Sequence, residues 1–125
     1  MRNTLLIAGG IHALLFAAFH LCFWRLFRWR AELARVSTIN RGVMQVLNLC
    51  LTYLFIALGL VTLVDREEIM ATRLGHHLLL VLCLFWIIRL VEQFVFFAER
   101  SWRSVWLDVL FLAGAVIYGL PLVME

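Results

Sequence analysis

Long apolar runs separated by short charged connections dominate the sequence. Four runs, at residues 4–24, 44–64, 76–97 and 105–124, are each about as long as a bilayer is thick when coiled as a helix. Charged residues concentrate in the connections between them, at 25–43, 65–75 and 98–104. We therefore predict an all-α integral membrane protein in which residues 1–125 form a single transmembrane domain, an antiparallel four-helix bundle.

Composition supports this prediction and excludes two other classes of protein. The chain is 65% hydrophobic and 15% charged, with a mean hydropathy of +0.98, well above the values of a water-soluble domain. With a single proline and so much apolar surface, it is not a disordered chain either. The first run is longer than the apolar part of a cleavable signal peptide, so we expect it to be retained.

Arginine supplies all eleven Lys or Arg residues, and its distribution predicts an orientation. If all four runs cross, the connections 25–43 and 98–104 share one side, which is far richer in arginine than the other. Because cytoplasmic loops carry the excess of positive charge, we expect both termini on the periplasmic or outer side of a bacterial inner (plasma) membrane. The arginines on the predicted cytoplasmic side are Arg25, Arg28, Arg30, Arg35, Arg41, Arg100 and Arg103, against Arg2, Arg66 and Arg73 on the other side.

The connection 25–43 has an amphipathic pattern of its own. Leu26, Trp29 and Leu33 recur at helical spacing, and charged residues repeat the spacing one position earlier. We expect a basic amphipathic helix on the cytoplasmic face that contacts anionic lipid headgroups. The alternative, that the positive charge only enforces topology, stays open. The predicted headgroup contacts are Arg25, Arg28, Trp29, Arg30 and Arg35.

Polar residues inside the runs are the candidates for function, because a charged side chain in hydrocarbon costs about 2.5–3.5 kcal/mol even on the most lenient scale. Arg89, Glu92 and Gln93 lie at i, i+3 and i+4, on one face of a helix that we expect to point into the bundle. Counting from the inner ends of the four runs places a polar group from each helix at a similar depth. The predicted intramembrane polar cluster is His20, Asn48, Arg89, Glu92, Gln93 and Asp108.

This cluster has two readings that the sequence leaves open. It is either a static network that fixes the register of the helices or a proton relay or polar binding pocket open to the cytoplasm. The chain has no phosphate-binding loop, dinucleotide fingerprint, nucleophile elbow or zinc-protease motif, so we do not expect an enzyme. We predict a structural or partner-binding membrane subunit, with a small transporter or proton-coupled module as the alternative.

A haem-binding redox protein is the second alternative, since helical membrane proteins can hold haem between two histidines. The depths of His12, His20, His76 and His77 differ along the runs, so we expect no cofactor and no metal. The expected partners are the lipid bilayer with its anionic headgroups and a second copy of the chain or another membrane protein. Nucleic acid is not among them, because the arginines gather at the predicted membrane boundary.

Overall fold

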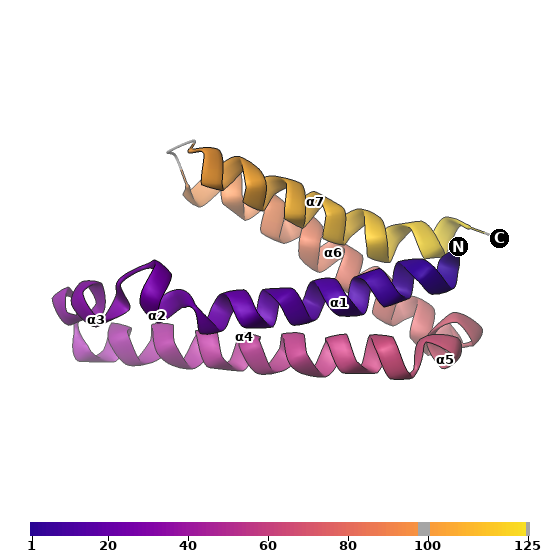
Figure 1. Cartoon of the computed structure of the whole chain (residues 1–125), viewed down its shortest axis with the longest axis horizontal. Helices are drawn as coiled ribbons and strands as arrows, with labels where there is room; N and C mark the ends of the chain where they lie inside the picture. The colour runs from indigo at the N-terminus through magenta and orange to yellow at the C-terminus, as the bar shows by residue number, and fades with distance from the viewer. Residues whose placement is uncertain (98–100, 125) are drawn as a thin grey trace. The chain divides into compact units, whose positions relative to one another are not determined.

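The computed structural model describes residues 1–97 and 101–124, and all the regular structure within them is helical. This confirms the predicted all-α class. Short helical segments separate the first long helix from the second and the second from the third (Figure 1). The elements are α1 (Arg2–Leu21), α2 (Phe23–Leu26), α3 (Trp29–Glu32), the 3-10 turn η1 (Leu33–Arg35), α4 (Thr38–Val64), α5 (Arg66–Ala71), α6 (Arg73–Phe96) and α7 (Trp102–Val123).

Four of these helices, α1, α4, α6 and α7, are long and apolar enough to cross a membrane, and each corresponds to one predicted run. The largest difference is at the start of α4, which begins at Thr38 rather than near residue 44. The Ser37 hydroxyl accepts the Asn40 N–H at 3.2 Å at this end of α4. Ser101 is the N-cap of α7, and its hydroxyl accepts the Ser104 N–H at 3.3 Å.

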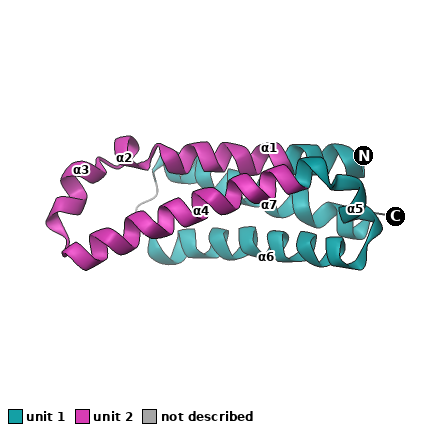
Figure 2. Cartoon of the chain, turned by 90° about the horizontal axis from the view of Figure 1, so that it is seen from below, with its two compact units in different colours: residues 1–9, 62–125 teal, residues 10–61 magenta. Residues whose placement is uncertain are grey.

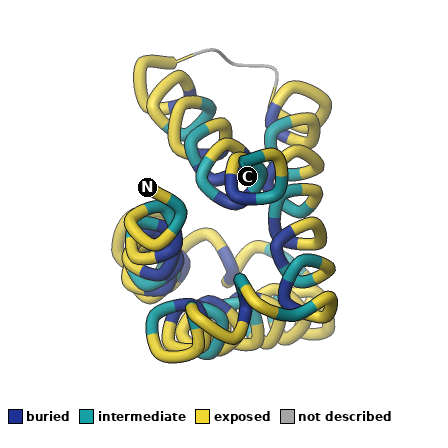
Figure 3. Tube along the Cα trace, turned by 90° about the vertical axis from the view of Figure 1, so that its right-hand side faces the viewer, coloured by how far each residue is buried: buried dark blue, intermediate teal, exposed yellow. Residues whose placement is uncertain are grey.

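The chain divides into two compact units (Figure 2). Unit 1 comprises residues 1–9 and 62–125, and unit 2 comprises residues 10–61, so the boundaries fall inside α1 and α4. Along each long helix, buried positions alternate with exposed ones at helical spacing (Figure 3). The two units are described separately below.

In unit 1, α6 and α7 pack as an antiparallel pair. The buried positions of α6 include Leu79, Leu82, Trp86 and Gln93, separated by three, four and seven residues, which is the spacing of a helix–helix seam. Trp86 stacks on Phe111 with ring centroids 6.0 Å apart, and Gln93 bonds to Ser104. Residues later in α6 therefore contact residues earlier in α7, as antiparallel packing requires.

The two ends of the chain also meet within unit 1. An Arg2 Nη1 donates to the Met124 carbonyl at 3.0 Å, and about two turns further in, the Tyr118 hydroxyl donates to the Gly9 carbonyl at 2.7 Å. A Cβ at Gly9 would lie 2.9 Å from the Tyr118 ring, so glycine permits this close approach. Gly75 permits a second close approach. A Cβ there would overlap the Ile69 carbonyl, so the absence of a side chain lets α5 fold closely onto the start of α6.

In unit 2, α1 and α4 pack as a second antiparallel pair. A Cβ at Gly59 would lie 3.0 Å from the Gly10 carbonyl oxygen, so the two helix backbones come close there. One turn or more along, Phe16 contacts Phe55 with ring centroids 5.8 Å apart. Small residues thus set the contact at one end of the pair, and aromatic residues fill the wider space further along.

The segment between α1 and α4 differs from its prediction. Instead of one amphipathic helix it forms α2, α3 and η1, and the break falls at Arg28, whose φ of 51° is left-handed. Of the predicted apolar stripe, Trp29 and Leu33 are buried, whereas Leu26 is 56% exposed. A continuous helix would keep these residues on one side. The prediction was wrong because the left-handed residue interrupts the helix, and only the part after it buries its apolar side chains.

Candidate functional site

The polar residues predicted inside the membrane form two groups, one in each unit. The first is His20 with Asn48. The His20 Nδ1 lies 2.8 Å from Asn48 Oδ1, and Asn48 Nδ2 donates to the His20 carbonyl at 3.1 Å. Since the amide oxygen only accepts, the ring nitrogen is the donor, and the two side chains form a reciprocal clamp.

The surroundings of this clamp are aromatic. The His20 ring stacks on Phe23 with centroids 4.4 Å apart and an interplanar angle of 25°, and it lies 5.4 Å from the Phe55 ring. Asn48 is only 5% exposed, and its own carbonyl accepts the Thr52 hydroxyl at 2.8 Å. The histidine is therefore held in one orientation by an amide on one side and by rings on the others.

The second group lies between α6 and α7 and forms a directional line of hydrogen bonds. Arg89 Nη2 donates to Gln93 Oε1 at 3.1 Å, and Gln93 Nε2 donates to the Ser104 hydroxyl at 3.1 Å. The Arg89 guanidinium also lies over the Phe111 ring, 4.6 Å from its centroid. A cation over an aromatic face is attracted by the negative charge of that face, so Arg89 is stabilised by both α6 and α7.

The two carboxylates of the predicted cluster have different positions. Both interact electrostatically with Arg89, but Asp108 is half-buried on the seam of α7, whereas Glu92 is exposed. The sequence placed Glu92 and Gln93 together on the inward face. The structure buries Gln93, which is 3% exposed, and turns the neighbouring Glu92 outward. Ser104 is the member of this group that the predicted cluster did not include.

The predicted headgroup residues lie in the segment between α1 and α4. Arg25, Arg28, Arg30 and Arg35 are exposed, and Arg35 forms an ion pair with Glu32 at 3.8 Å. Trp29 is buried instead, with its ring 5.1 Å from that of Trp24 and 5.6 Å from that of Phe23. Its indole belongs to the packing of unit 2.

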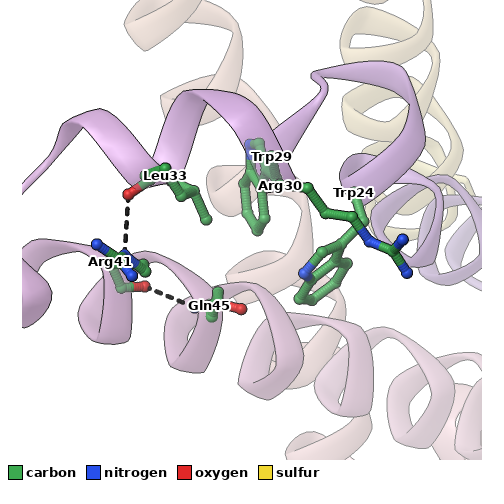
Figure 4. A pocket seen from close by; sticks show the side chains of 7 residues that line it. Trp24, Trp29, Arg30, Leu33, Arg41 and Gln45 are labelled. Atoms are coloured by element: carbon green, nitrogen blue, oxygen red, sulfur yellow. Dashed lines mark hydrogen bonds between the residues drawn. The ribbon is translucent and has the colours of Figure 1, made fainter.

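A cavity of about 130 Å³ lies in this same part of unit 2, beside α3, η1 and the start of α4 (Figure 4). Its lining combines two tryptophans, two arginines, a glutamine and two small or aliphatic side chains. Arg41 and Gln45, which the sequence did not connect with the earlier residues, enter the lining because α4 begins as early as Thr38. The lining residues are Trp24, Trp29, Arg30, Leu33, Ala34, Arg41 and Gln45.

The histidines and cysteines do not gather into a metal-binding group within residues 1–97 and 101–124. His12 packs against Phe16 with ring centroids 4.9 Å apart, and the His76 Nδ1 lies 2.8 Å from the Thr72 carbonyl. Cys22 and Cys50 lie within predicted apolar runs, yet both are exposed. A helix that is apolar all round has apolar outer faces too, so a position within such a run need not be buried.

Comparison with known proteins yields no relative: no family model, no curated protein and no solved structure matches the chain.

Proposed function

We propose that this chain is a multi-pass membrane protein in which α1, α4, α6 and α7 cross the bilayer. The observation that carries the proposal is the small share of each apolar helix buried inside the protein, from 22% for α6 to 39% for α1. In water the remaining apolar surface would be far larger than soluble monomers expose. In a bilayer the same surface faces hydrocarbon at no cost.

The proposed orientation places both termini outside a bacterial plasma membrane. The contact between Arg2 and the Met124 carbonyl supports termini on one side, as an even number of crossings requires. The arginine-rich connections 25–43 and 98–104 support a cytoplasmic position for the opposite side. The proposed headgroup contacts are the exposed arginines of the first connection.

Carbonate extraction and cysteine labelling test this arrangement. In a variant with its native cysteines replaced, a single cysteine at Arg35 is expected to react with a membrane-impermeant maleimide only after the cells are opened. The matched control is Asn3→Cys. This cysteine should react with the same maleimide in cells whose plasma membrane is intact, once the layers outside that membrane have been made permeable. Release of the protein by carbonate would overturn the membrane proposal, and the reverse labelling pattern would overturn only the orientation.

Within the membrane, we propose a structural or partner-binding subunit. The support is the way its interior polar groups are used: His20 and Asn48 bond to each other, and Gln93 bonds to both Arg89 and Ser104. Side chains that satisfy one another in this way lock helices together. The proposed partner is a second copy of the chain or another membrane protein packed on the exposed helix faces.

Site-specific photocrosslinking in native membranes tests for such a partner. Tyr53 is 69% exposed on α4, whereas Phe55 on the same helix is 5% exposed and serves as the matched control. A photoreactive residue at 53 is expected to yield one discrete protein adduct, and the same residue at 55 only intramolecular adducts. Lipid adducts alone at position 53, and at further exposed positions on α6 and α7, would refute the partner-binding role.

One observation favours a second candidate, a proton-coupled module. Arg89 interacts electrostatically with two carboxylates, Glu92 and Asp108, in a helix pair proposed to lie in the membrane. Protein reconstituted in liposomes would then show a proton flux that Asp108→Asn abolishes while the protein remains folded. A flux that survives both Asp108→Asn and Glu92→Gln would exclude this candidate.

A further inference from the structure

The cavity in unit 2 lies beside the break in the helix between α2 and α3. Arg28 takes the left-handed conformation, and the following turns bring Trp29 and Leu33 back onto the protein, where they are 9% and 5% exposed. Arg41 Nε then donates to the Leu33 carbonyl at 2.9 Å. This bond ties the start of η1 to α4 and so fixes one wall of the cavity.

Gln45 lines the cavity from α4, next to Arg41. Its Nε2 donates to the Arg41 carbonyl at 3.2 Å, one turn back along α4. Figure 4 shows the Leu33–Arg41 and Gln45–Arg41 bonds side by side, with the Trp29 ring standing above α4 between Arg41 and Trp24. The walls are therefore held by hydrogen bonds and by aromatic packing.

The cavity has positive charge that the described residues do not neutralise. A guanidinium has five N–H donors, and the Arg41 side chain uses Nε on Leu33. Arg30 is exposed, and no carboxylate within residues 1–97 and 101–124 lies within ion-pair distance of Arg30 or Arg41. The nearby acidic residue Glu32 pairs with Arg35 instead. The complementary ligand is an anion.

Apart from Gln45, the rest of the lining is apolar, which narrows the class of anion to one that carries an apolar part. Trp24 and Trp29 meet edge to face with centroids 5.1 Å apart, and Leu33 and Ala34 complete the wall. Indole rings favour the headgroup level of a bilayer. A volume of about 130 Å³ is close to the roughly 150 Å³ of a cavity that holds one benzene, so it admits a headgroup and not a whole lipid.

We propose that this cavity binds the headgroup phosphate of an anionic phospholipid, with Arg30 and Arg41 as the cationic contacts and Trp24 and Trp29 against the glycerol region. The proposal rests on the membrane arrangement proposed above, which places the segment 22–37 at the cytoplasmic surface. It goes beyond general attraction of arginines to a negative surface, because it selects Arg30 and Arg41 over the equally charged Arg25 and Arg35.

Native mass spectrometry of the full chain, released from nanodiscs of phosphatidylglycerol and phosphatidylcholine, tests the proposal. Wild-type protein is expected to retain one phosphatidylglycerol in preference to phosphatidylcholine. A hydrogen bond to a charged group contributes about 1.5–3 kcal/mol, so Arg30→Gln should lower this retention about tenfold or more. Arg35→Gln removes the same charge from an exposed position outside the cavity and is the matched control, with no loss expected.

A second variant distinguishes loss of the cavity from loss of charge and from misfolding. Ala34→Phe fills the cavity without changing any charge, and it should lower retention as Arg30→Gln does while helicity stays unchanged. Equal losses for Arg30→Gln and Arg35→Gln would overturn the proposal in favour of diffuse attraction. Displacement of the lipid by millimolar inorganic phosphate would overturn it in favour of a free-anion site.

The two proposals fail in distinguishable ways. If wild-type protein does not enter nanodiscs and is released by carbonate, the membrane proposal is wrong. If wild-type protein enters nanodiscs but retains phosphatidylglycerol and phosphatidylcholine equally, only the lipid site is wrong.

Discussion

Replacing Gln93 by leucine removes the residue that joins α6 to α7 through polar contacts. Leucine is similar in size and suits an apolar seam, so the change tests the hydrogen bonds and leaves the packing nearly intact. Gln93 is 3% exposed, accepts from Arg89 and donates to Ser104, both at 3.1 Å. Polar contacts between membrane helices contribute about 0.6 kcal/mol on average and up to about 1.7 kcal/mol. Two such bonds predict a loss of about 1–3 kcal/mol.

The free energy of unfolding is measured by titrating the protein in mixed micelles with a denaturing detergent and following helicity. The matched control is Glu92→Gln, which changes the adjacent side chain on the same helix. Because Glu92 is exposed, we expect its effect to stay within about 0.5 kcal/mol. The control therefore separates the buried position from the exposed one.

A double-mutant cycle of Gln93→Leu with Ser104→Ala isolates the contact between the helices. We expect a coupling energy of about 0.6–1.7 kcal/mol. The reasoning is refuted if the two changes are additive within experimental error. It is also refuted if Glu92→Gln costs as much as Gln93→Leu, since the polar face of α6 would then point as the sequence alone predicted.

Three further changes have definite expected outcomes in the same unfolding titration. Gly75→Ala should destabilise the protein by more than about 2 kcal/mol, because its Cβ would overlap the Ile69 backbone. Gly42→Ala is the control: a Cβ there has nothing within 4 Å, so this change should stabilise the protein by about 0.5–1 kcal/mol. Equal effects of the two changes would contradict this prediction. Arg28→Gly should stabilise by about 1 kcal/mol, because φ is 51° there, and a loss of stability would count against a strained turn. Asn48→Leu should cost about 1–3 kcal/mol by removing both bonds to His20, and it should shift the imidazole resonances in NMR spectra; unchanged resonances would show that the clamp is absent.

The sequence predicted the long helices well because their signal is large. Twenty consecutive apolar residues have few alternatives to a helix in lipid or in a helical core, and each predicted run has its counterpart in the structure. The ends were less predictable. The start of α4 includes Asn40 and Arg41, which lower the hydropathy of any window, yet the Ser37 cap and the bond from Arg41 to Leu33 stabilise these extra turns.

The break at Arg28 could not be read from residue spacing. Its apolar neighbours keep the helical repeat, and arginine is a good helix former, so local preference favours one continuous helix. The burial of Trp29 among Phe23 and Trp24 competes with that preference. A large aromatic side chain gains more from such burial than one left-handed residue costs, and the tertiary contact therefore decides the conformation.

On α6 the sequence identified the polar face only to within one residue. Glu92 and Gln93 are about 100° apart around a helix, and both lie within one turn of Arg89, so either could face the partner helix. The spacing from Trp86 provides the missing signal. Seven residues beyond that buried ring, two turns along a seam, is Gln93.

The identity of Gln93 also bears on the choice between the two proposed functions. A proton relay needs groups that exchange a proton near neutral pH, and the line from Arg89 through Gln93 to Ser104 contains none: a guanidinium keeps its proton, and an amide and an aliphatic hydroxyl neither release nor take one up. Asp108 is the titratable member of this group that lies on the seam, and its neighbour there is a permanent cation. Such a line is suited to fixing the register of two apolar helices, whose other contacts discriminate poorly between one alignment and the next. The absence of an exchangeable proton along this line favours the structural role. Because Asp108 is titratable and Glu92 is exposed, Asp108→Asn is the decisive variant for the relay.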